Sequence, residues 1–290
     1  MKVLVLGASG LIGSTLFDVL SKQKNYEVLG TVREERMKHF FSPSIASNLF
    51  VNIDLRNHDE LVKMMHQIHP DVVVNCAGLT KHKAEANDPL SAIPINSMMP
   101  HQLARSCATI GSRLIHISTD CVFSGEKGGY LENDFTDARD IYGKSKALGE
   151  IDYLDAITLR TSTIGHELNS SYGLLEWFLS QNESCIGYRS AIFSGLPTIV
   201  LAEIIRDVVI PQKKLSGLYH VAAQPINKYD LLKIIAAEYG KSILISPDDS
   251  FVIDRSLNAT KFHAATGYIA PEWPELIRSM ATFKQNLENS

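Results

Sequence analysis

Cysteine is scarce in this chain of 290 residues. The four cysteines lie far apart and no two form a Cys-x-x-Cys pair; they are Cys76, Cys107, Cys121 and Cys185. This spacing argues against a disulfide framework and against a zinc site. His66 and His69 share the face of a predicted helix, but no third ligand with metal spacing lies near them in the sequence. We therefore expect reduced thiols, a cytoplasmic protein and no metal.

Long apolar stretches and runs of like charge are also absent. The N-terminal apolar run covers only Val3 to Leu6 and stops at Gly7, whereas a membrane span needs about 18 uninterrupted apolar residues. Lysine and arginine total 28, aspartate and glutamate 32, and the formal net charge is −4. We expect neither a signal peptide nor a membrane segment. The charge gives no support to nucleic-acid binding.

What the chain does have is a regular alternation of short aliphatic runs and amphipathic segments. The runs are nearly continuous, as expected of parallel strands covered on both faces. The predicted strands are 3–6, 27–32, 49–53, 71–76, 113–118 and 156–160, and the predicted helices are 12–23, 58–69, 89–110 and 141–153. They predict an α/β fold with a doubly wound parallel Rossmann sheet over residues 1–162.

The alternation weakens after Arg160. Helical periodicity returns at 198–209, 228–239 and 272–287, with short strand-like pieces at 217–221 and 242–245. We predict a smaller α/β substrate-binding lobe over residues 163–290, with the chain free to cross between the two lobes.

A glycine-rich turn follows the first predicted strand. It reads Gly7-Ala-Ser-Gly10-Leu-Ile-Gly13 and opens the first predicted helix. Glycine at these positions permits a tight turn, lets backbone amides approach a pyrophosphate, and brings the helix N-terminus towards the phosphates. A plain strand-to-helix turn would give the same spacing, but its place between strand and helix favours a dinucleotide site.

The second and third predicted strands end where the adenosine half of a dinucleotide would lie. Arg33 favours the 2′-phosphate of NADP over the free hydroxyls of NAD. The alternative is that Arg33 and Arg36 are surface residues paired with Glu34 and Glu35, which contributes little. Asp54 is placed either to meet an edge of adenine or to cap the next helix.

The candidate catalytic residues follow the fifth predicted strand. Ser118-Thr119-Asp120 ends that strand, and Tyr142 and Lys146 lie four residues apart, one turn along the next helix. A lysine ammonium there favours the phenolate and lowers the tyrosine pKa, so that Tyr142 can exchange a proton. A Thr119 hydroxyl can hydrogen-bond a substrate carbonyl. The alternative is that Tyr142 and Lys146 are ordinary exposed helix residues.

Taken in order, these motifs resemble the extended short-chain dehydrogenase/reductases, and more narrowly the dTDP-4-dehydrorhamnose reductase group of nucleotide-sugar reductases. The residues that carry the narrower resemblance are Val74-Asn-Cys-Ala-Gly-Leu-Thr80, Lys83-Ala-Glu85, Ile95-Asn96, Ile117-Ser-Thr-Asp-Cys-Val-Phe-Ser-Gly125, Tyr142-Gly-Lys-Ser-Lys-Ala-Leu-Gly-Glu150, Arg160-Thr-Ser162 and Asp254-Arg-Ser-Leu-Asn258. Cys121, where the family more often has an aromatic residue, is a departure on the substrate side.

The resemblance implies a role for each matching position. The catalytic set would be Thr119, Tyr142 and Lys146, with Tyr142 as the acid. The cofactor would be held by Gly7, Ser9, Gly10, Leu11, Ile12, Gly13, Arg33, Asp54, Leu55, Ala77, Gly78, Lys83, Tyr142, Lys146, Arg160, Thr161 and Ser162. Thr119, Asp120 and Arg255 would contact the substrate, and Asn96 would lie close to the cofactor and its supporting loops.

Three further residues are candidates. Arg189 and Arg255 are nominated for a nucleotide diphosphate, because a guanidinium suits phosphate oxygens, although either can be a plain surface residue. Cys121 is expected to line the cleft, so that bound cofactor would slow its alkylation; an inert core thiol is the alternative.

These observations predict an NADPH-dependent reductase of a nucleotide-activated 4-keto-6-deoxy sugar, with NADH as the second cofactor choice, in deoxysugar and surface-polysaccharide synthesis. Two alternatives stay open. One is an epimerase or dehydratase on the same fold, for which Asp120 beside Thr119 would serve; the other is a non-catalytic dinucleotide-binding regulatory subunit. The expected partner is the nucleotide sugar, and a homodimer is compatible with the class.

Overall fold

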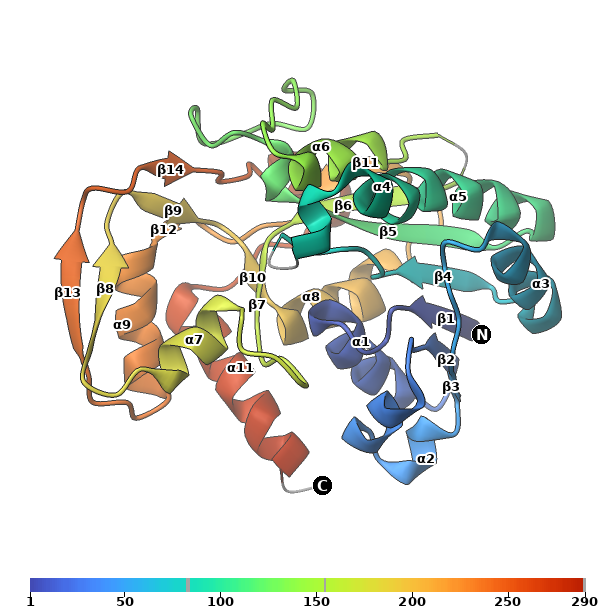
Figure 1. Ribbon diagram of the computed structural model, residues 1–290, viewed down its shortest axis with the longest axis horizontal. Helices are drawn as coiled ribbons and strands as arrows, with labels where there is room; N and C mark the ends of the chain where they lie inside the picture. The colour runs from blue at the N-terminus through green and yellow to red at the C-terminus, as the bar shows by residue number, and fades with distance from the viewer. Residues whose placement is uncertain (82–83, 154, 289–290) are drawn as a thin grey trace.

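The central sheet carries the elements that the aliphatic runs predict. A computed structural model describes residues 1–81, 84–153 and 155–288 (Figure 1). Seven strands form one sheet in the order β11-β6-β5-β4-β1-β2-β3, and every pairing in it is parallel. The strands are β1 (Lys2–Leu6), β2 (Glu27–Thr31), β3 (Leu49–Phe50), β4 (Val72–Asn75), β5 (Arg113–Thr119), β6 (Ile157–Thr161) and β11 (Gly217–His220). The strand order reverses between β1 and β4, which confirms the doubly wound Rossmann sheet and places its crevice at their carboxyl ends.

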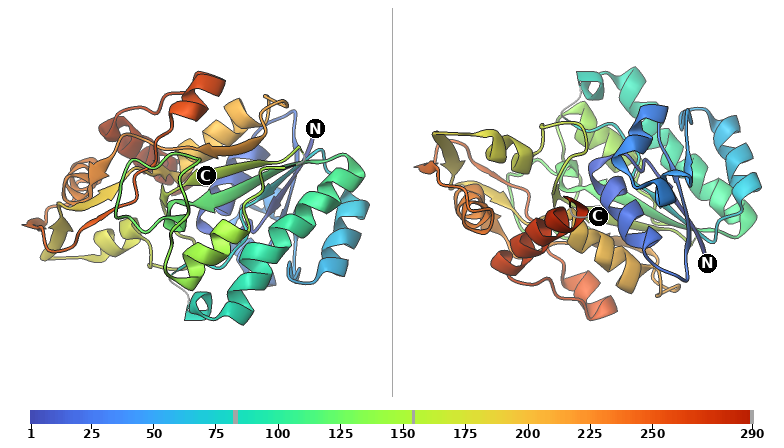
Figure 2. Two further views of the ribbon diagram at one scale, coloured as in Figure 1. Left: turned by 90° about the horizontal axis from the view of Figure 1, so that it is seen from above. Right: turned by 90° about the horizontal axis from the view of Figure 1, so that it is seen from below.

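Alternate residues of β1 enter two hydrophobic cores. Val3 and Val5 belong to the core that includes α1 (Leu11–Ser21) and α8 (Thr198–Ile204), whereas Leu4 and Leu6 belong to the core that includes α3 (His58–Ile68) and α5 (Met99–Ile110). Figure 2 shows the helices on both faces of the sheet. Burial on both faces explains why the strands read as continuous aliphatic runs. No helix within the described ranges is long and apolar enough to cross a membrane.

The predicted helix over 89–110 is interrupted. It consists of α4 (Pro89–Ala92), a π-helical segment η3 (Ile93–Met98) and α5. Pro94 and Pro100 lack the backbone donors that a continuous α-helix would need. The bulge turns Asn96, which is 1% exposed, towards the loop after β4, in keeping with the frequent use of π-bulges at functional sites.

A smaller lobe lies at the left of Figure 1, on the side towards which the arrows of β1 and β4 point. Its sheets are short: β8 (Ser184–Tyr188) pairs with β13 (Leu244–Asp248), and β9 (Ala191–Phe193) lies between β12 (Ile226–Asn227) and β14 (Ile253–Asp254). A third pair joins β7 (Thr163–Ile164) and β10 (Leu196–Pro197). The other elements are η1 (Glu35–Phe40), α2 (Pro43–Ala46), η2 (Ala84–Asn87), η4 (Asp120–Val122), α6 (Ile141–Leu148), α7 (Leu174–Ser180), η5 (Ile205–Val209), α9 (Lys228–Glu238), α10 (Thr260–Thr266) and α11 (Trp273–Glu288).

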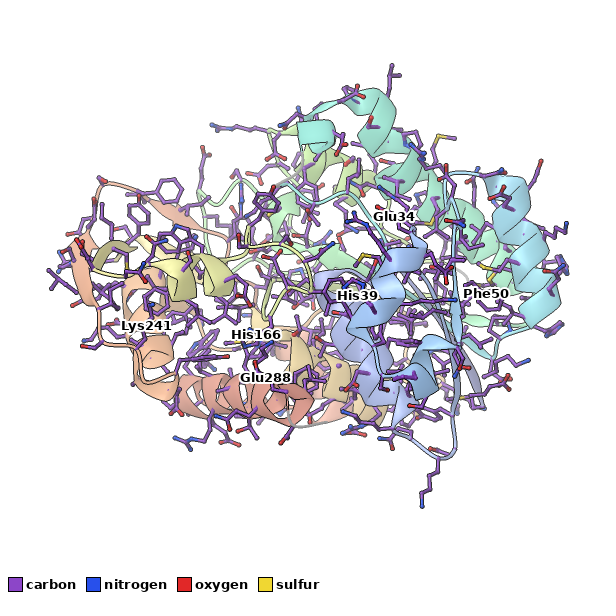
Figure 3. All side chains as sticks on the ribbon, turned by 60° about the horizontal axis from the view of Figure 1, so that its bottom comes forward. Glu34, His39, Phe50, His166, Lys241 and Glu288 are labelled. Carbon is purple, nitrogen blue, oxygen red and sulfur yellow. The ribbon has the colours of Figure 1, made fainter. Side chains whose placement is uncertain are left out.

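The chain crosses between the two lobes after residue 162. Helix α8 returns to pack against α1, where Thr15 Oγ1 donates to Thr198 Oγ1 at 3.1 Å, and β11 pairs with β6 along the edge of the main sheet. Figure 3 shows His166 between α7 and α11, above the end that carries Glu288. Its ring contacts Glu176 at 2.7 Å and the Tyr239 hydroxyl at 2.9 Å. The division of the chain at residue 162 stays a prediction. Helix α8 and strand β11 come after this residue in the sequence but belong to the part of the protein that contains the main sheet.

Candidate active site

The glycine turn is packed too closely for side chains. Gly7 has φ +77°, and a Cβ on it would lie 2.9 Å from the Cα of Ala77. A Cβ on Gly13 would lie 2.1 Å from the Gly7 carbonyl oxygen. The first residues of α1, Leu11 and Ile12, have no acidic neighbour in the first turn, and no side chain caps the helix. Helix α1 therefore presents its positive end to the crevice, a cradle that fits a pyrophosphate.

Two buried asparagines hold the loop after β4 against this turn. Asn75 Oδ1 accepts from the Ala77 amide at 3.1 Å. Asn96 accepts from the Leu79 amide at 2.9 Å and donates to the Leu79 carbonyl at 3.3 Å. A Cβ on Gly78 would lie 2.9 Å from Asn96 Oδ1. The structure thus brings Ala77 and Gly78 beside Gly7, where the prediction placed the middle of the cofactor.

Arginine and aspartate side chains lie together where the prediction placed the adenosine half of the cofactor. Arg33 is exposed just beyond β2 and helps to lower the pKa of Asp54, although the hydrogen bond from Arg56 is the largest cause. Arg56 Nη2 lies 2.8 Å from Asp54 Oδ2. The helix-capping alternative for Asp54 is wrong, because Asn57 caps α3 by accepting from the Glu60 amide at 3.3 Å. Arg36 pairs with Glu34, so the surface interpretation is correct for that arginine.

Leu55, Ser9 and Lys83 are also predicted to bind the cofactor, and the structure describes the first two. Leu55 is buried at 8% exposure, and Ser9 is half-buried in the glycine turn. Lys83 lies outside the described residues.

Thr119 and Tyr142 meet at the carboxyl end of β5. The Thr119 hydroxyl donates to Asp120 Oδ1 at 3.1 Å and accepts from the Cys121 amide at 3.2 Å. Burial raises the pKa of Tyr142 above its usual value, the neighbouring Cys121 raises it further, and an interaction with Thr119 lowers it. A phenol with a raised pKa is protonated at neutral pH, which suits a proton donor.

Lys146 lies one turn after Tyr142 and is 6% exposed. Its ammonium donates to the Ile117 carbonyl at 2.8 Å. Burial lowers the pKa of Lys146 to about 8, against the opposing effects of Glu150 and Cys76. The expectation that Lys146 lowers the tyrosine pKa is therefore wrong in this structure, because burial dominates at Tyr142 and the ammonium bonds to the backbone of β5.

The Arg160 side chain is committed inside the protein. It is 3% exposed, and its Nε and Nη2 donate to the Glu150 carboxylate at 2.7 and 2.6 Å. The guanidinium is therefore not available to a cofactor, and the prediction that Arg160 lines the nicotinamide end stays a prediction for its backbone. Thr161 lies opposite Thr119 in the β5–β6 pair, and Ser162 follows it, so both stay at the carboxyl end of the sheet.

The smaller lobe delivers Arg255 to the catalytic end. Its Nε donates to the Phe123 carbonyl at 2.8 Å, and Nη1 lies 3.5 Å from Cys121 Sγ. Cys121 is buried, and burial raises the pKa of its thiol to about 11, so the thiol stays protonated at neutral pH. Arg189, the other nominated arginine, forms an exposed ion pair with Asp249 and makes no hydrogen bond or ion pair with Thr119, Tyr142 or Lys146.

Sequence reasoning missed Lys228, the first residue of α9. Its pKa is lowered, first by burial and then by Lys81, while Asp120 and Cys121 raise it and Arg255 lowers it. Its ammonium makes no hydrogen bond or ion pair with any residue that the structure describes. Lys81, Lys228 and Arg255 thus gather near Asp120 from three distant segments. Only the capping pair Asn227 and Asp230 marked this helix start in the sequence.

The parallel sheet, the glycine cradle at its switch point and the Thr119, Tyr142 and Lys146 set are those of an extended short-chain dehydrogenase/reductase. The profile of the RmlD substrate binding domain matches residues 1–282, so the chain belongs to that family.

Individual relatives agree with this assignment. A dTDP-4-dehydrorhamnose reductase of Aggregatibacter actinomycetemcomitans is 28% identical over 240 residues, which cover 79% of this chain and 76% of that protein. The probable low-salt glycan biosynthesis reductase Agl14 of Haloferax volcanii is 32% identical over 271 residues, 89% of this chain and 85% of that protein. The crystal structure of dTDP-4-dehydrorhamnose reductase from Bacillus anthracis in complex with NADP superposes with a TM-score of 0.80 at 20% identity, covering 97% of this chain and 99% of the other.

Proposed function

We propose that this protein is an NADPH-dependent reductase of a nucleotide-activated 4-keto-6-deoxy sugar. The observation that carries the proposal is the convergence of Thr119, Tyr142 and Lys146 at the carboxyl end of β5, beside the glycine cradle. The names of its relatives, which are sugar-nucleotide and glycan-biosynthesis reductases, support the same chemistry.

The chain's own residues supply the proton and the orientation. A nicotinamide cofactor supplies a hydride to the keto carbon when bound. The Thr119 hydroxyl holds the carbonyl oxygen, and Tyr142 donates the proton that completes the alcohol. The Lys146 ammonium, held on the Ile117 carbonyl, would hold the cofactor ribose.

The charges on either side of the cleft support the choice of ligands. Lys81, Lys228 and Arg255 near Asp120 suit the diphosphate of a nucleotide sugar. Exposed Arg33 beyond β2 suits a 2′-phosphate, which favours NADPH over NADH. The four cysteines are free thiols, which supports a reducing compartment such as the cytoplasm. The finer assignment, to deoxysugar synthesis for surface polysaccharide, belongs to the same proposal.

The test is NADPH oxidation with a panel of nucleotide 4-keto-6-deoxy sugars prepared in place by dehydratases, with NADH in parallel. We expect net oxidation with one member of the panel and a preference for NADPH. Conversion of a sugar nucleotide without net NADPH consumption would favour an epimerase or dehydratase. Cofactor binding with no conversion would favour a regulatory subunit.

A further inference from the structure

A buried carboxylate lies just behind the catalytic residues. Glu150 Oε1 accepts from the Ser118 hydroxyl at 2.6 Å and from Arg160 Nε at 2.7 Å, and Oε2 accepts from Arg160 Nη2 at 2.6 Å. The side chains of Arg160 and Glu150 are only 4% and 10% exposed. Such a bidentate, desolvated contact is directional and well ordered.

The three residues of this contact stand next to the catalytic machinery in the chain. Ser118 directly precedes Thr119, and Ser118 and Arg160 lie opposite each other where β5 pairs with β6. Glu150 comes four residues after Lys146. One carboxylate therefore links the segment after α6 to two neighbouring strands at the point where Thr119 leaves the sheet.

Arg160 extends the link towards the substrate side. Its Nη1 donates to the Glu132 carbonyl at 3.3 Å and contacts His220 Nε2 at 3.2 Å. Its guanidinium lies 5.1 Å from the centre of the Phe123 ring, and the carbonyl of Phe123 accepts from Arg255. The network thus connects α6, which carries Lys146, to the segment around Phe123 that Arg255 contacts.

Stability alone does not account for this arrangement. A buried ion pair contributes little net stability compared with a well-packed apolar pair, because desolvation offsets the attraction. An apolar pair would lack two properties: the hydrogen bond that fixes Ser118, and a carboxylate near Lys146, whose charge the paired Arg160 offsets in part.

The charge near Lys146 comes from few groups. Burial lowers the pKa of Lys146 to about 8, and Glu150 is the largest opposing influence, followed by Cys76 from the loop after β4. His116 faces Lys146 from β5, but burial and the ammonium hold the pKa of its imidazole well below the usual value, so it is neutral. Burial also raises the pKa of the Cys76 thiol to about 12, so that group is neutral too.

We propose that Glu150 is a positioning residue for this active site: through Ser118 it fixes Thr119, and through its charge it keeps the Lys146 ammonium protonated in a buried position. The inference rests on the proposed reductase function and adds a residue to it.

The test compares Ser118→Ala and Glu150→Gln with a matched control, Ser112→Ala. Ser112 is also buried and donates to a backbone carbonyl, that of Pro70, but at the opposite end of the sheet. For Ser118→Ala we expect kcat to fall about tenfold, with the NADPH KM little changed, because Thr119 is misplaced. For Glu150→Gln we expect a fall of about a hundredfold, since both Thr119 and Lys146 are affected.

The pH profile separates positioning from mere loss of structure. Removing the Glu150 charge lowers the pKa of Lys146, so the ammonium is lost at lower pH and the alkaline limb of the kcat profile moves down. In Ser118→Ala the charge remains and the limb stays in place. In Ser112→Ala both kcat and the limb match the wild type.

The outcomes are decisive in each case. An unchanged kcat in Ser118→Ala, or an equal fall of kcat in Ser112→Ala, overturns the proposal that Glu150 fixes Thr119 through Ser118. An unmoved alkaline limb in Glu150→Gln overturns the proposal that its charge keeps Lys146 protonated. If Glu150→Gln does not fold, the pH dependence is taken from Glu150→Asp, which keeps the charge on a shorter side chain: kcat falls while the limb holds, and a displaced limb contradicts the proposal.

Failure of the proposed function is distinguishable from failure of this inference. If the wild type reduces no panel sugar, NADPH affinity is followed by fluorescence against pH, which needs no sugar. Affinity that weakens at lower pH in Glu150→Gln than in the wild type supports the role of Glu150, and identical curves overturn it.

Discussion

The proposed cofactor side and the proposed substrate side of the active site differ in what forms their surface. On the cofactor side the surface is backbone: Gly7, Gly13 and Ala77 lie so close that side chains would collide. On the substrate side the surface is charged side chains, with Lys228 and Arg255 arriving from the smaller lobe. A backbone surface is damaged by adding atoms, and a side-chain surface is damaged by removing charge. Mutations of opposite kind should therefore separate the two sides.

The residue that serves both sides should show the largest effect. Tyr142→Phe removes the proton donor and leaves the ring in place, so we expect turnover to fall by about a hundredfold or more, with cofactor affinity nearly intact. NADPH oxidation measures the first and fluorescence titration the second. The control is Tyr153→Phe, whose hydroxyl bonds to His101 at 2.6 Å away from the site; unchanged turnover in Tyr142→Phe would refute its assignment.

On the cofactor side, one added methyl group should be enough to weaken NADPH binding and destabilise the fold. Gly13→Ala places a Cβ 2.1 Å from the Gly7 carbonyl, and we expect NADPH affinity to fall roughly thirtyfold and unfolding free energy by about 1–3 kcal/mol, as overpacking typically costs. The matched change is Gly10→Ala, whose Cβ meets the same oxygen at an ordinary 3.4 Å. Titration and thermal unfolding compare the two, and equal losses of unfolding free energy would contradict the close packing of Gly13.

On the side-chain side, truncation should affect the sugar alone. Arg255→Ala removes a guanidinium near Asp120, and we expect the sugar-nucleotide KM to rise about tenfold, the value of one charge-assisted hydrogen bond, with the NADPH KM unchanged. Arg189→Ala, which breaks only an exposed pair with Asp249, should leave both constants as they are. Equal effects of the two arginines would remove Arg255 from the substrate site.

The smallest effect is expected where the cofactor side does use a side chain. Arg33→Ala should raise the NADPH KM about fivefold and leave the NADH KM unchanged, because an exposed cation interacts weakly through solvent. Steady-state rates with both cofactors give the ratio. An equal rise in the KM of both cofactors would mean that Arg33 supports the local fold and does not select the 2′-phosphate.

The same difference between a backbone surface and a side-chain surface decides what could be predicted from the sequence. Backbone surfaces demand glycine at fixed spacing, so the cradle and strands β1 to β6 were predictable. Pro94 and Pro100 carried the signal for the break at η3, which periodicity alone did not reveal. The two-residue strands β7, β10, β12 and β14 were not predictable, because partners far along the chain define them.

Side-chain surfaces left weaker signals. Lys228 resembles any helix-start lysine until folding brings it beside Lys81 and Arg255. Arg160 lies within a motif of the family and was therefore assigned to the cofactor, yet its guanidinium binds Glu150. The raised pKa of Tyr142 follows from burial, which spacing along a helix does not report.

The late return of β11 to the main sheet has a consequence for synthesis on the ribosome. Until residues 217–220 emerge, β6 is an unpaired edge with exposed backbone groups, the kind of surface that invites aggregation. The core beneath α1 also needs Leu276, Ile277 and Met280 from α11, so it closes only after these residues have been made. A chain truncated before α11 should leave this core open and yield insoluble protein.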